Sequence, residues 1–335
     1  MSTHRFALPA VVAVALSGAI GITGPVASAG GVARGDQPWI AYQTGYHKTT
    51  GWGPGGIWLV HPDGSGDHQV AVGVHDEQAL PDWSPDGSRL AFSTRGGSTE
   101  PLFEYDLTTE TTTQLFACEE ECLGDDEPAY SPDGAKVAFI RALGPFTDTG
   151  PSDCSLWIGE LASHNVQQLT KNGSCDRETM PRWSPDGTRL TYYRELYDQQ
   201  SDTVLATAVF ILDVATAEEH QLTPWSLDFG EPDWSPDGNW IVMASYPLHS
   251  YNSGVGVHHS NLFRIHPNGT GLEQITSYQA AQARATQPRY TPDGTGIVFT
   301  AVTHNSRELW IQPNADGKPN RVTNGGIATH GTLQP

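Results

Sequence analysis

The sequence predicts an all-β fold, a six-bladed β-propeller with four strands in each blade. Three observations lead to it: one heptapeptide recurs five times, two apolar runs follow every copy, and the last residues resemble the start of a further copy. The copies share the pattern P-x-[WY]-[ST]-P-D-G and begin at Pro81, Pro128, Pro181, Pro232 and Pro288. Their spacings of 47, 53, 51 and 56 residues are typical of repeated supersecondary units that stack on one another.

Each repeat contains four predicted strands, which we call A to D in chain order. The S-P-D-G core predicts a tight turn between strands A and B, because proline presets the backbone angle and glycine adopts the left-handed conformation. Apolar runs such as 90–92 and 102–105 predict strands B and C. A polar turn then leads to a short strand D, for example at 167–170. No helical periodicity is evident after the first 29 residues.

The two ends of the chain predict how the ring closes. Residues 39–42 and 57–60 have the character of strands B and C, but no strand A precedes them. Residues 332–335 match the approach to another leading proline, 47 residues after Pro288. We therefore expect the C-terminal strand to complete the N-terminal blade, which leaves no open sheet edge.

The first 29 residues predict a secretory signal peptide. His4 and Arg5 form a short positive start, residues 6–22 are mostly apolar, and small residues at 27–29 offer a cleavage site before Gly30. Residues 30–335 are then expected to form a single propeller domain. The protein should be secreted or held in the periplasm or cell-wall space, without stable membrane insertion once the leader is cleaved; the sequence leaves open whether it is cleaved or retained.

Composition narrows the possible partners. The chain has 38 Asp and Glu against 18 Lys and Arg, a formal net charge of −20. Nucleic-acid binding requires the opposite sign and is excluded on this ground. A basic partner or a cation is electrostatically favoured, although excess acid also keeps exported proteins soluble.

Four cysteines in an exported chain predict two disulfides. Proximity within the loops favours pairing Cys118 with Cys122 and Cys154 with Cys175. Other pairings stay open, because connectivity cannot be deduced from sequence.

The repeat resembles that of the TolB-type six-bladed β-propeller family, over about residues 37 to 335. Similar repeats also occur in propellers attached to serine peptidases. The resemblance implies the fold and a tendency to bind partners at the face of the ring. We expect the additional α/β domain of TolB to be lacking, and the hydrolase domain of the peptidases as well, so the resemblance does not imply a role in the Tol system.

Strand polarity divides the connections between two faces. The A–B and C–D turns share one face, here the turn face, and the B–C and D–A loops share the other, the loop face. The turn aspartates Asp86, Asp133, Asp186, Asp237 and Asp293 are expected to be structural.

The D–A loops carry charged residues that no turn geometry requires. They are Asp76, Glu77, Asp125, Asp126, Asp176, Arg177, Asp228, Glu231, Arg284 and His330. Carboxylates about 4 Å apart repel by ~4 kcal/mol at a surface-like dielectric unless a cation or basic group lies between them. These residues are therefore the predicted ligand-binding ring; the alternative is a set of scattered, solvated acids.

Long B–C loops at 144–155, 195–207 and 247–260 add to the loop face, where recognition usually resides. Five histidines lie in B–C loops, His47, His249, His258, His259 and His304. They raise the possibility of a divalent cation, but no H-E-x-x-H spacing occurs, so no cofactor is expected.

No G-x-S-x-G nucleophile motif is present. The sequence therefore favours a secreted, non-catalytic module that binds a protein, peptide or glycan at its acidic loop face. The alternative is a metal-assisted polysaccharide lyase or hydrolase with its site at the channel mouth.

Overall fold

The computed structural model describes residues 37–47, 51–74, 76–96, 99–118, 121–144, 153–171, 178–198, 203–246, 260–278, 283–303, 306–314, 317–324 and 326–335. Gln37–Pro335 form one compact unit, separate from Met1–Asp36. The predicted signal peptide and the domain boundary at residue 30 lie outside the described residues and stay predictions. Within the described ranges, no helix has the length and apolar character needed to span a membrane.

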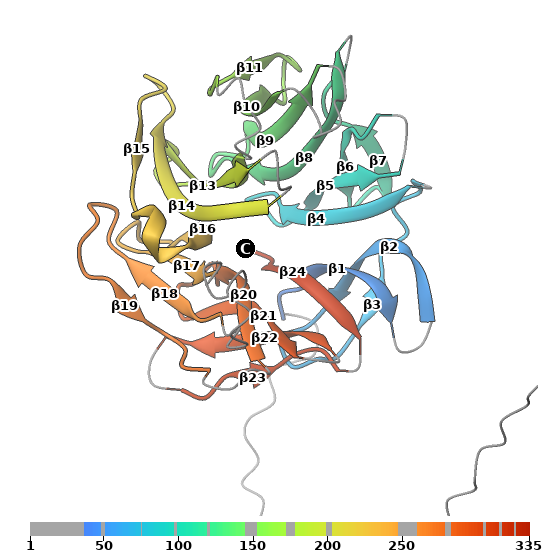
Figure 1. Ribbon diagram of the computed structural model, residues 1–335. Coiled ribbons are helices and arrows are strands. Elements are labelled where there is room, and N and C mark those ends of the chain that lie inside the picture. Colours follow the sequence, from blue (N-terminus) through green and yellow to red (C-terminus); the bar gives the residue numbers. More distant parts are fainter. Residues whose placement is uncertain are drawn as a thin grey trace, which may run out of the picture. The chain divides into compact units, whose positions relative to one another are not determined.

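Four sheets of this unit contain four antiparallel strands each (Figure 1). The first two are β4 (Glu77–Trp83), β5 (Arg89–Arg95), β6 (Leu102–Asp106) and β7 (Thr111–Gln114), then β8 (Cys122–Tyr130), β9 (Lys136–Leu143), β10 (Asp153–Glu160) and β11 (Val166–Gln168). The next two are β12 (Glu178–Trp183), β13 (Arg189–Asp198), β14 (Thr203–Asp213) and β15 (Glu219–Gln221), then β16 (Phe229–Trp234), β17 (Ile241–Ser245), β18 (Leu262–Ile265) and β19 (Glu273–Gln274). A 3-10 helix, η1 (Trp225–Leu227), precedes β16.

The fifth sheet is broader and corrects the predicted blade count. Its eight strands are β20 (Ala283–Tyr290), β21 (Gly296–Thr303), β22 (Arg307–Pro313), β23 (Asn320–Arg321), β24 (Ile327–Leu333), β1 (Ile40–His47), β2 (Gly51–Val60) and β3 (His68–Gln69). The prediction of six separate four-stranded blades is wrong, since the described residues form four such sheets and one eight-stranded sheet. The cause is a parallel bridge between Arg307 of β22 and Ile327 of β24, which joins strands β20 to β23 to the strands β24, β1, β2 and β3.

The two ends of the chain pair inside this broad sheet. Strand β24 runs antiparallel to β1, with Leu333 opposite Ile40. Gln334 then makes three hydrogen bonds: its N–H donates to the Trp39 carbonyl at 2.7 Å, its Oε1 accepts from the Trp39 N–H at 3.1 Å, and its Nε2 donates to the Gly87 carbonyl at 2.7 Å. The C-terminus is thereby attached both to the N-terminal strand and to the first S-P-D-G turn.

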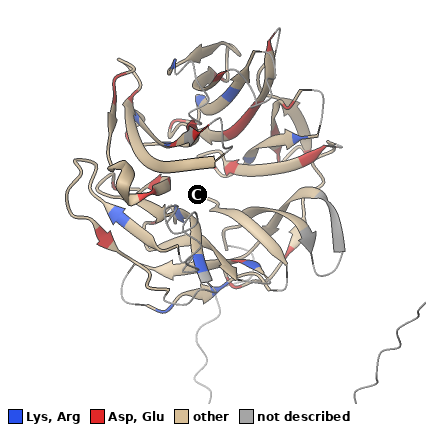
Figure 2. Ribbon diagram, in the orientation of Figure 1, with Lys and Arg blue, Asp and Glu red and all other residues tan. Residues whose placement is uncertain are grey.

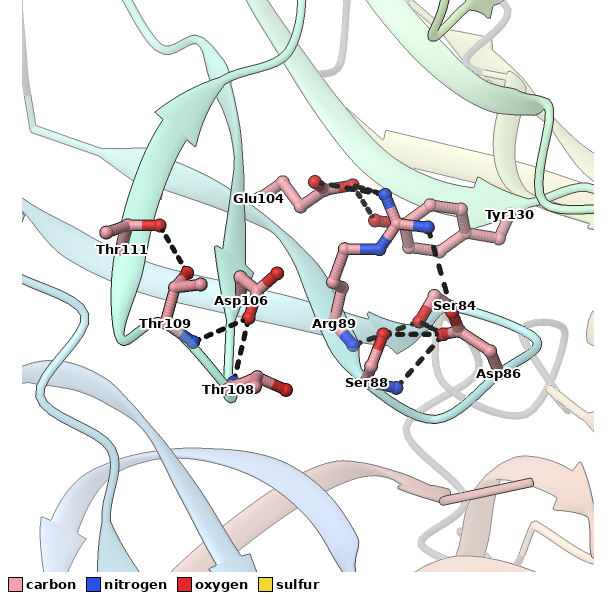
Figure 3. A network of polar contacts seen from close by, with 10 residues as sticks. All are labelled: Ser84, Asp86, Ser88, Arg89, Glu104, Asp106, Thr108, Thr109, Thr111 and Tyr130. Carbon is pink, nitrogen blue, oxygen red and sulfur yellow. Dashed lines mark hydrogen bonds and ion pairs between the residues drawn. The ribbon is translucent and has the colours of Figure 1, made fainter.

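The S-P-D-G turns are held by their own side chains, and Figure 3 shows the first of them. Asp86 Oδ1 accepts hydrogen bonds from the Ser84 hydroxyl at 2.6 Å, the Ser88 N–H at 3.0 Å and the Ser88 hydroxyl at 2.8 Å. These bonds, that of Ser84 first, lower the pKa of Asp86 to about 2. Equivalent bonds form at Asp133, Asp186, Asp237 and Asp293. The turn aspartates thus stabilise the turns, as their sequence context indicates.

A recurrent threonine connects strands D and C. Thr170, Thr223, Thr276 and Thr323 each accept, at 2.9 Å, the N–H of the residue fourteen positions earlier. Each hydroxyl thus supplies an acceptor for a buried backbone N–H of strand C.

The inner strands β4, β8, β12, β16, β20 and β24 contact one another in a closed ring. Apolar side chains fill the space between neighbouring sheets; for example, Leu156 of β10 packs in one cluster with Leu190 and Tyr192 of β13. The aromatic residues of the five heptapeptides all belong to such clusters. Each buried large apolar side chain contributes roughly 1.5–3 kcal/mol, so this packing fixes the inner strands around their common centre.

Candidate functional site

One residue near the middle of each inner strand has a left-handed backbone, although none of them is glycine. They are Leu80, Glu127, Met180, Glu231, Gln287 and His330, with φ between 53° and 58°. The strand pairings shift register at this point of the inner strands, which marks a β-bulge. Bulges redirect a side chain and are frequent beside functional sites.

These residues line a small pocket at the centre of the ring, which we call the axial pocket. Its lining consists of the six left-handed residues, four of the leading prolines, and Arg182 and Arg289. The cavity volume of about 10 Å³ is that of one water-sized group. Because every inner strand contributes to it, the pocket is a property of the ring and not of any single sheet.

Two carboxylates of the axial pocket brace the neighbouring inner strands. Glu231 Oε2 accepts the N–H of Gln287 at 2.5 Å, and Glu127 accepts the N–H of Met180. Gln287 Oε1 continues the pattern by accepting the N–H of His330 at 3.1 Å. The side chain of one left-handed residue thus satisfies the backbone of the next.

Two arginines occupy the inner strands two residues further along. Arg289 lies between two aspartates, with one nitrogen 3.5 Å from Asp82 Oδ1 and the other 3.5 Å from Asp233 Oδ1. Arg182 is 8% exposed, and its Nη1 donates to the carbonyl of Pro181 at 2.6 Å. Among the described residues, no carboxylate forms an ion pair with Arg182.

Burial shifts the titration of the pocket groups. It raises the pKa of Glu127 and of Glu231 to about 7. Burial, and then the charge of Arg289, lowers the pKa of Arg182 to about 9. Burial, with Arg289 and Arg182 next, lowers the pKa of His330 to about 3. At neutral pH the imidazole is therefore uncharged, Arg182 is a cation, and the two glutamates are partly protonated.

The structure brings two of the ten predicted ring residues into the axial pocket, Glu231 and His330. Asp125 is instead buried in an ion pair with Arg141 of β9, with N–O distances of 2.7 and 2.8 Å. Asp126 forms a 3.0 Å ion pair with Arg95.

The remaining predicted residues are dispersed. Asp228 is buried beside η1, Asp76 is half-buried, and Glu77 and Arg284 are exposed. Asp176 and Arg177 lie outside the described residues. Figure 2 likewise shows acidic and basic residues spread over all the sheets and not gathered at one place. The ligand-binding role of the ten residues stays a prediction.

Sequence reasoning missed three polar residues of the pocket, Arg182, Gln287 and Arg289, and it left Glu127, which it placed in a D–A loop, out of the predicted ligand-binding ring. The signal that could have found them lies in the repeat itself, at the residue before each leading proline and the residue after it. These two positions vary between apolar and charged residues from copy to copy, unlike the turn residues that follow.

The disulfide between Cys118 and Cys122 is present. Cys175 lies outside the described residues, so its pairing with Cys154 stays a prediction. In the portion of the chain that is described, no group of three His, Cys, Asp or Glu side chains is arranged to hold a metal. The side chains of His47, His249, His258, His259 and His304 are not among those described.

Comparison with known proteins places the fold in context. The model of the family described as the TolB beta propeller domain matches residues 156–335. The uncharacterized peptidase YuxL of Bacillus subtilis is 26% identical over 203 residues, which cover 52% of this chain and 29% of that protein. The chain thus spans less than a third of that relative's length.

Two further similarities cover more of the chain. The oligogalacturonide lyase of Pectobacterium atrosepticum is 23% identical over 302 residues, 83% of this chain and 71% of that protein. The crystal structure of TolB from Acinetobacter baumannii superimposes with a TM-score of 0.67 at 19% identity, covering 89% of this chain and 67% of that one. The structural similarity concerns the fold alone.

Proposed function

This chain belongs to the TolB beta propeller domain family, and we propose on that basis that it is an extracytoplasmic binding module. Its partner is a protein, peptide or glycan that docks on the loop face, over the end of the axial pocket at which the inner strands begin. Folds of this kind carry several functions, so the proposal depends on the site and not on the family alone.

The observation that carries the proposal is the axial pocket. Six strands from different parts of the chain each place one left-handed residue there, and strained non-glycine residues persist where the surrounding structure holds them. The exposed Glu77 and Arg284, at the beginnings of strands β4 and β20, supply charged groups at the same ends of the inner strands. A partner centred on the ring would contact both regions.

The extracytoplasmic location has two supports. One is the leader-like composition of residues 1–29. The other is the Cys118–Cys122 disulfide, since disulfides persist in oxidising compartments. Fractionation of cells that produce the full chain tests the location directly; recovery of the protein in the cytoplasm alone contradicts it.

The binding proposal is tested by capture from the extracytoplasmic fraction, followed by affinity measurement with the purified partner. The double variant Glu77→Gln and Arg284→Gln should weaken the affinity by several-fold, because each exposed charge contributes up to about 1 kcal/mol. The matched control is Glu218→Gln, an exposed acid on the turn between β14 and β15. An equal effect of both variants, or no captured partner, contradicts the proposal.

A second candidate is a metal-assisted polysaccharide lyase. The alignment with the oligogalacturonide lyase over 83% of this chain favours it. Elemental analysis of the purified protein and an assay for the unsaturated uronate product provide the test. Stoichiometric metal together with turnover would show that the protein is a lyase and not a binding module. If neither metal nor turnover is found, the binding module stands.

A further inference from the structure

We propose that the axial pocket binds a carboxylate group through Arg182 and His330. This inference rests on the proposed function, because it names the chemical group that a partner or ligand places at the centre of the ring. It follows from which hydrogen-bonding groups of the pocket are already used and which are not.

The acceptors of the pocket are used. Glu127 Oε1 accepts from the Thr179 hydroxyl at 2.5 Å, and its other oxygen accepts from the Met180 N–H. Glu231 accepts from the Gln287 N–H at 2.5 Å and from the Tyr246 hydroxyl. The glutamates therefore already have donors and need no cation to satisfy them.

His330 presents a donor without a partner. Gln287 Oε1 accepts from the Thr300 hydroxyl at 2.9 Å and from the backbone N–H of His330 at 3.1 Å. These two bonds fix the orientation of the Gln287 amide. The amide nitrogen of Gln287 then donates to His330 Nε2 at 2.8 Å. In the neutral imidazole the proton must therefore lie on Nδ1, and this atom is buried without a hydrogen-bond partner.

Arg182 is the second open donor. Arg182 is 8% exposed and lines the pocket, and its guanidinium makes one hydrogen bond, to the Pro181 carbonyl. The nearby Asp82 and Asp233 are engaged by Arg289. A buried cation is costly unless it is paired. A carboxylate supplies that pair, since the one oxygen that enters the pocket accepts a charge-assisted hydrogen bond from the guanidinium.

The volume of the pocket limits how much of a ligand can enter it. A cavity of about 10 Å³ admits one oxygen atom, so the rest of the ligand lies outside. The same position could hold a water molecule, but a water adds no negative charge to that of Asp82, Asp233 and Glu127, which favour the Arg182 cation without forming an ion pair with it.

The pocket predicts how binding depends on pH. Ionised Glu127 and Glu231 repel a carboxylate, and both have a pKa raised to about 7 by burial. Of the other facing groups, Arg182 and Arg289 are cations, Asp82 and Asp233 pair with Arg289, and His330 is neutral. Binding should therefore strengthen as the pH falls through about 7 and the glutamates become protonated.

The test uses the purified protein and formate, the smallest carboxylate, with formamide as the neutral isostere and chloride as the simple anion at equal ionic strength. Formate should raise the melting temperature in a saturable manner, and formamide should not. Arg182→Ala should weaken the apparent formate affinity by about tenfold or more, because it removes a charge-assisted bond. Ala129 already occupies the equivalent position of β8.

A second pocket variant keeps the test conclusive if Arg182→Ala does not fold. His330→Met should weaken formate binding by several-fold, and Met180 shows that methionine is accommodated at the equivalent position. The control Arg264→Ala removes an arginine of β18 that pairs with Glu273 outside the pocket, and should leave formate binding unchanged. A formate effect no larger than that of chloride, or one retained in both pocket variants, overturns the inference.

The sources of the carboxylate are then separated. A short peptide with a free C-terminus is compared with its amide, and with galacturonate, each in competition with formate. If a partner is captured but formate does not bind, this inference fails and the binding module stands. If formate binds but no partner is captured, the proposed function fails and the carboxylate site stands.

Discussion

The six left-handed residues of the inner strands are each in a conformation that costs a non-glycine residue roughly 1–3 kcal/mol. Their neighbours compensate this cost. The carboxylates of Glu127 and Glu231 and the amide of Gln287 accept N–H groups of the following inner strand. Gln43 Oε1 does the same for the N–H of Leu80, at 2.6 Å. The same arrangement buries the carboxylates of Glu127 and Glu231 and thereby raises their pKa. The stability of the folded state should therefore depend on whether these two groups are ionised.

This coupling predicts a pH-dependent stability. A carboxyl whose pKa is raised in the folded state stabilises most at low pH. Its contribution is lost as the pH rises from the ordinary value of 4.5, at which the unfolded chain ionises, to the folded value of about 7. The double variant Glu127→Gln and Glu231→Gln keeps an acceptor oxygen at each site but cannot ionise. Above about pH 8 it should be more stable than the wild type, by up to about 3 kcal/mol per group.

Urea unfolding at about pH 4.5 and about pH 9, on either side of this window, measures the difference. Glu218→Gln, an exposed substitution, should leave the pH dependence unchanged. If the double variant and the wild type lose stability in parallel over this range, the glutamates are not the titrating groups.

At the scale of elements, the sequence was most informative where local chemistry decides the structure. The S-P-D-G phrase predicts the turns because Asp86 and its equivalents bond within four residues. The apolar runs predict strands B and C because their burial repeats in every sheet. The axial pocket was not predictable, because the bonds that fix Glu127 and Glu231 cross between repeats more than fifty residues apart. The eight-stranded sheet was missed because one bridge, Arg307 to Ile327, decides it.

The threonine that follows strand D offers a test at this scale. Thr223 is 1% exposed and accepts the N–H of Val209 at 2.9 Å. Thr223→Val keeps the shape but leaves this buried donor unpaired, which should lower the free energy of unfolding by about 1–3 kcal/mol. Chemical denaturation measures the loss. Thr223→Ser retains the hydroxyl and should lose less; equal losses in both variants would show that packing of the methyl group, and not the hydrogen bond, matters here.

At the scale of the whole compact unit, the closed ring depends on pairing between residues almost three hundred positions apart. Strand β24 contributes a left-handed residue to the axial pocket and also pairs with β1. The Trp83 indole, from the first heptapeptide, donates to the Thr332 carbonyl at 3.0 Å. The last strand therefore couples the broad sheet, the first four-stranded sheet and the pocket, and the stability of each should depend on the same few residues.

Deletion of residues 329–335 should break this coupling. It removes His330 from the pocket, exposes the edge of β1, and takes away the acceptor of Trp83. Unfolding should then proceed in steps and not in one cooperative transition, because the sheets at the two ends of the chain are no longer joined. Calorimetry together with fluorescence of the tryptophans measures cooperativity. Gln334→Ala is the matched control, since it removes two side-chain hydrogen bonds and keeps β24; it should shift the transition by about 1–3 kcal/mol without dividing it. Unchanged cooperative melting of the deleted chain would show that the remaining contacts between inner strands suffice to hold the ring.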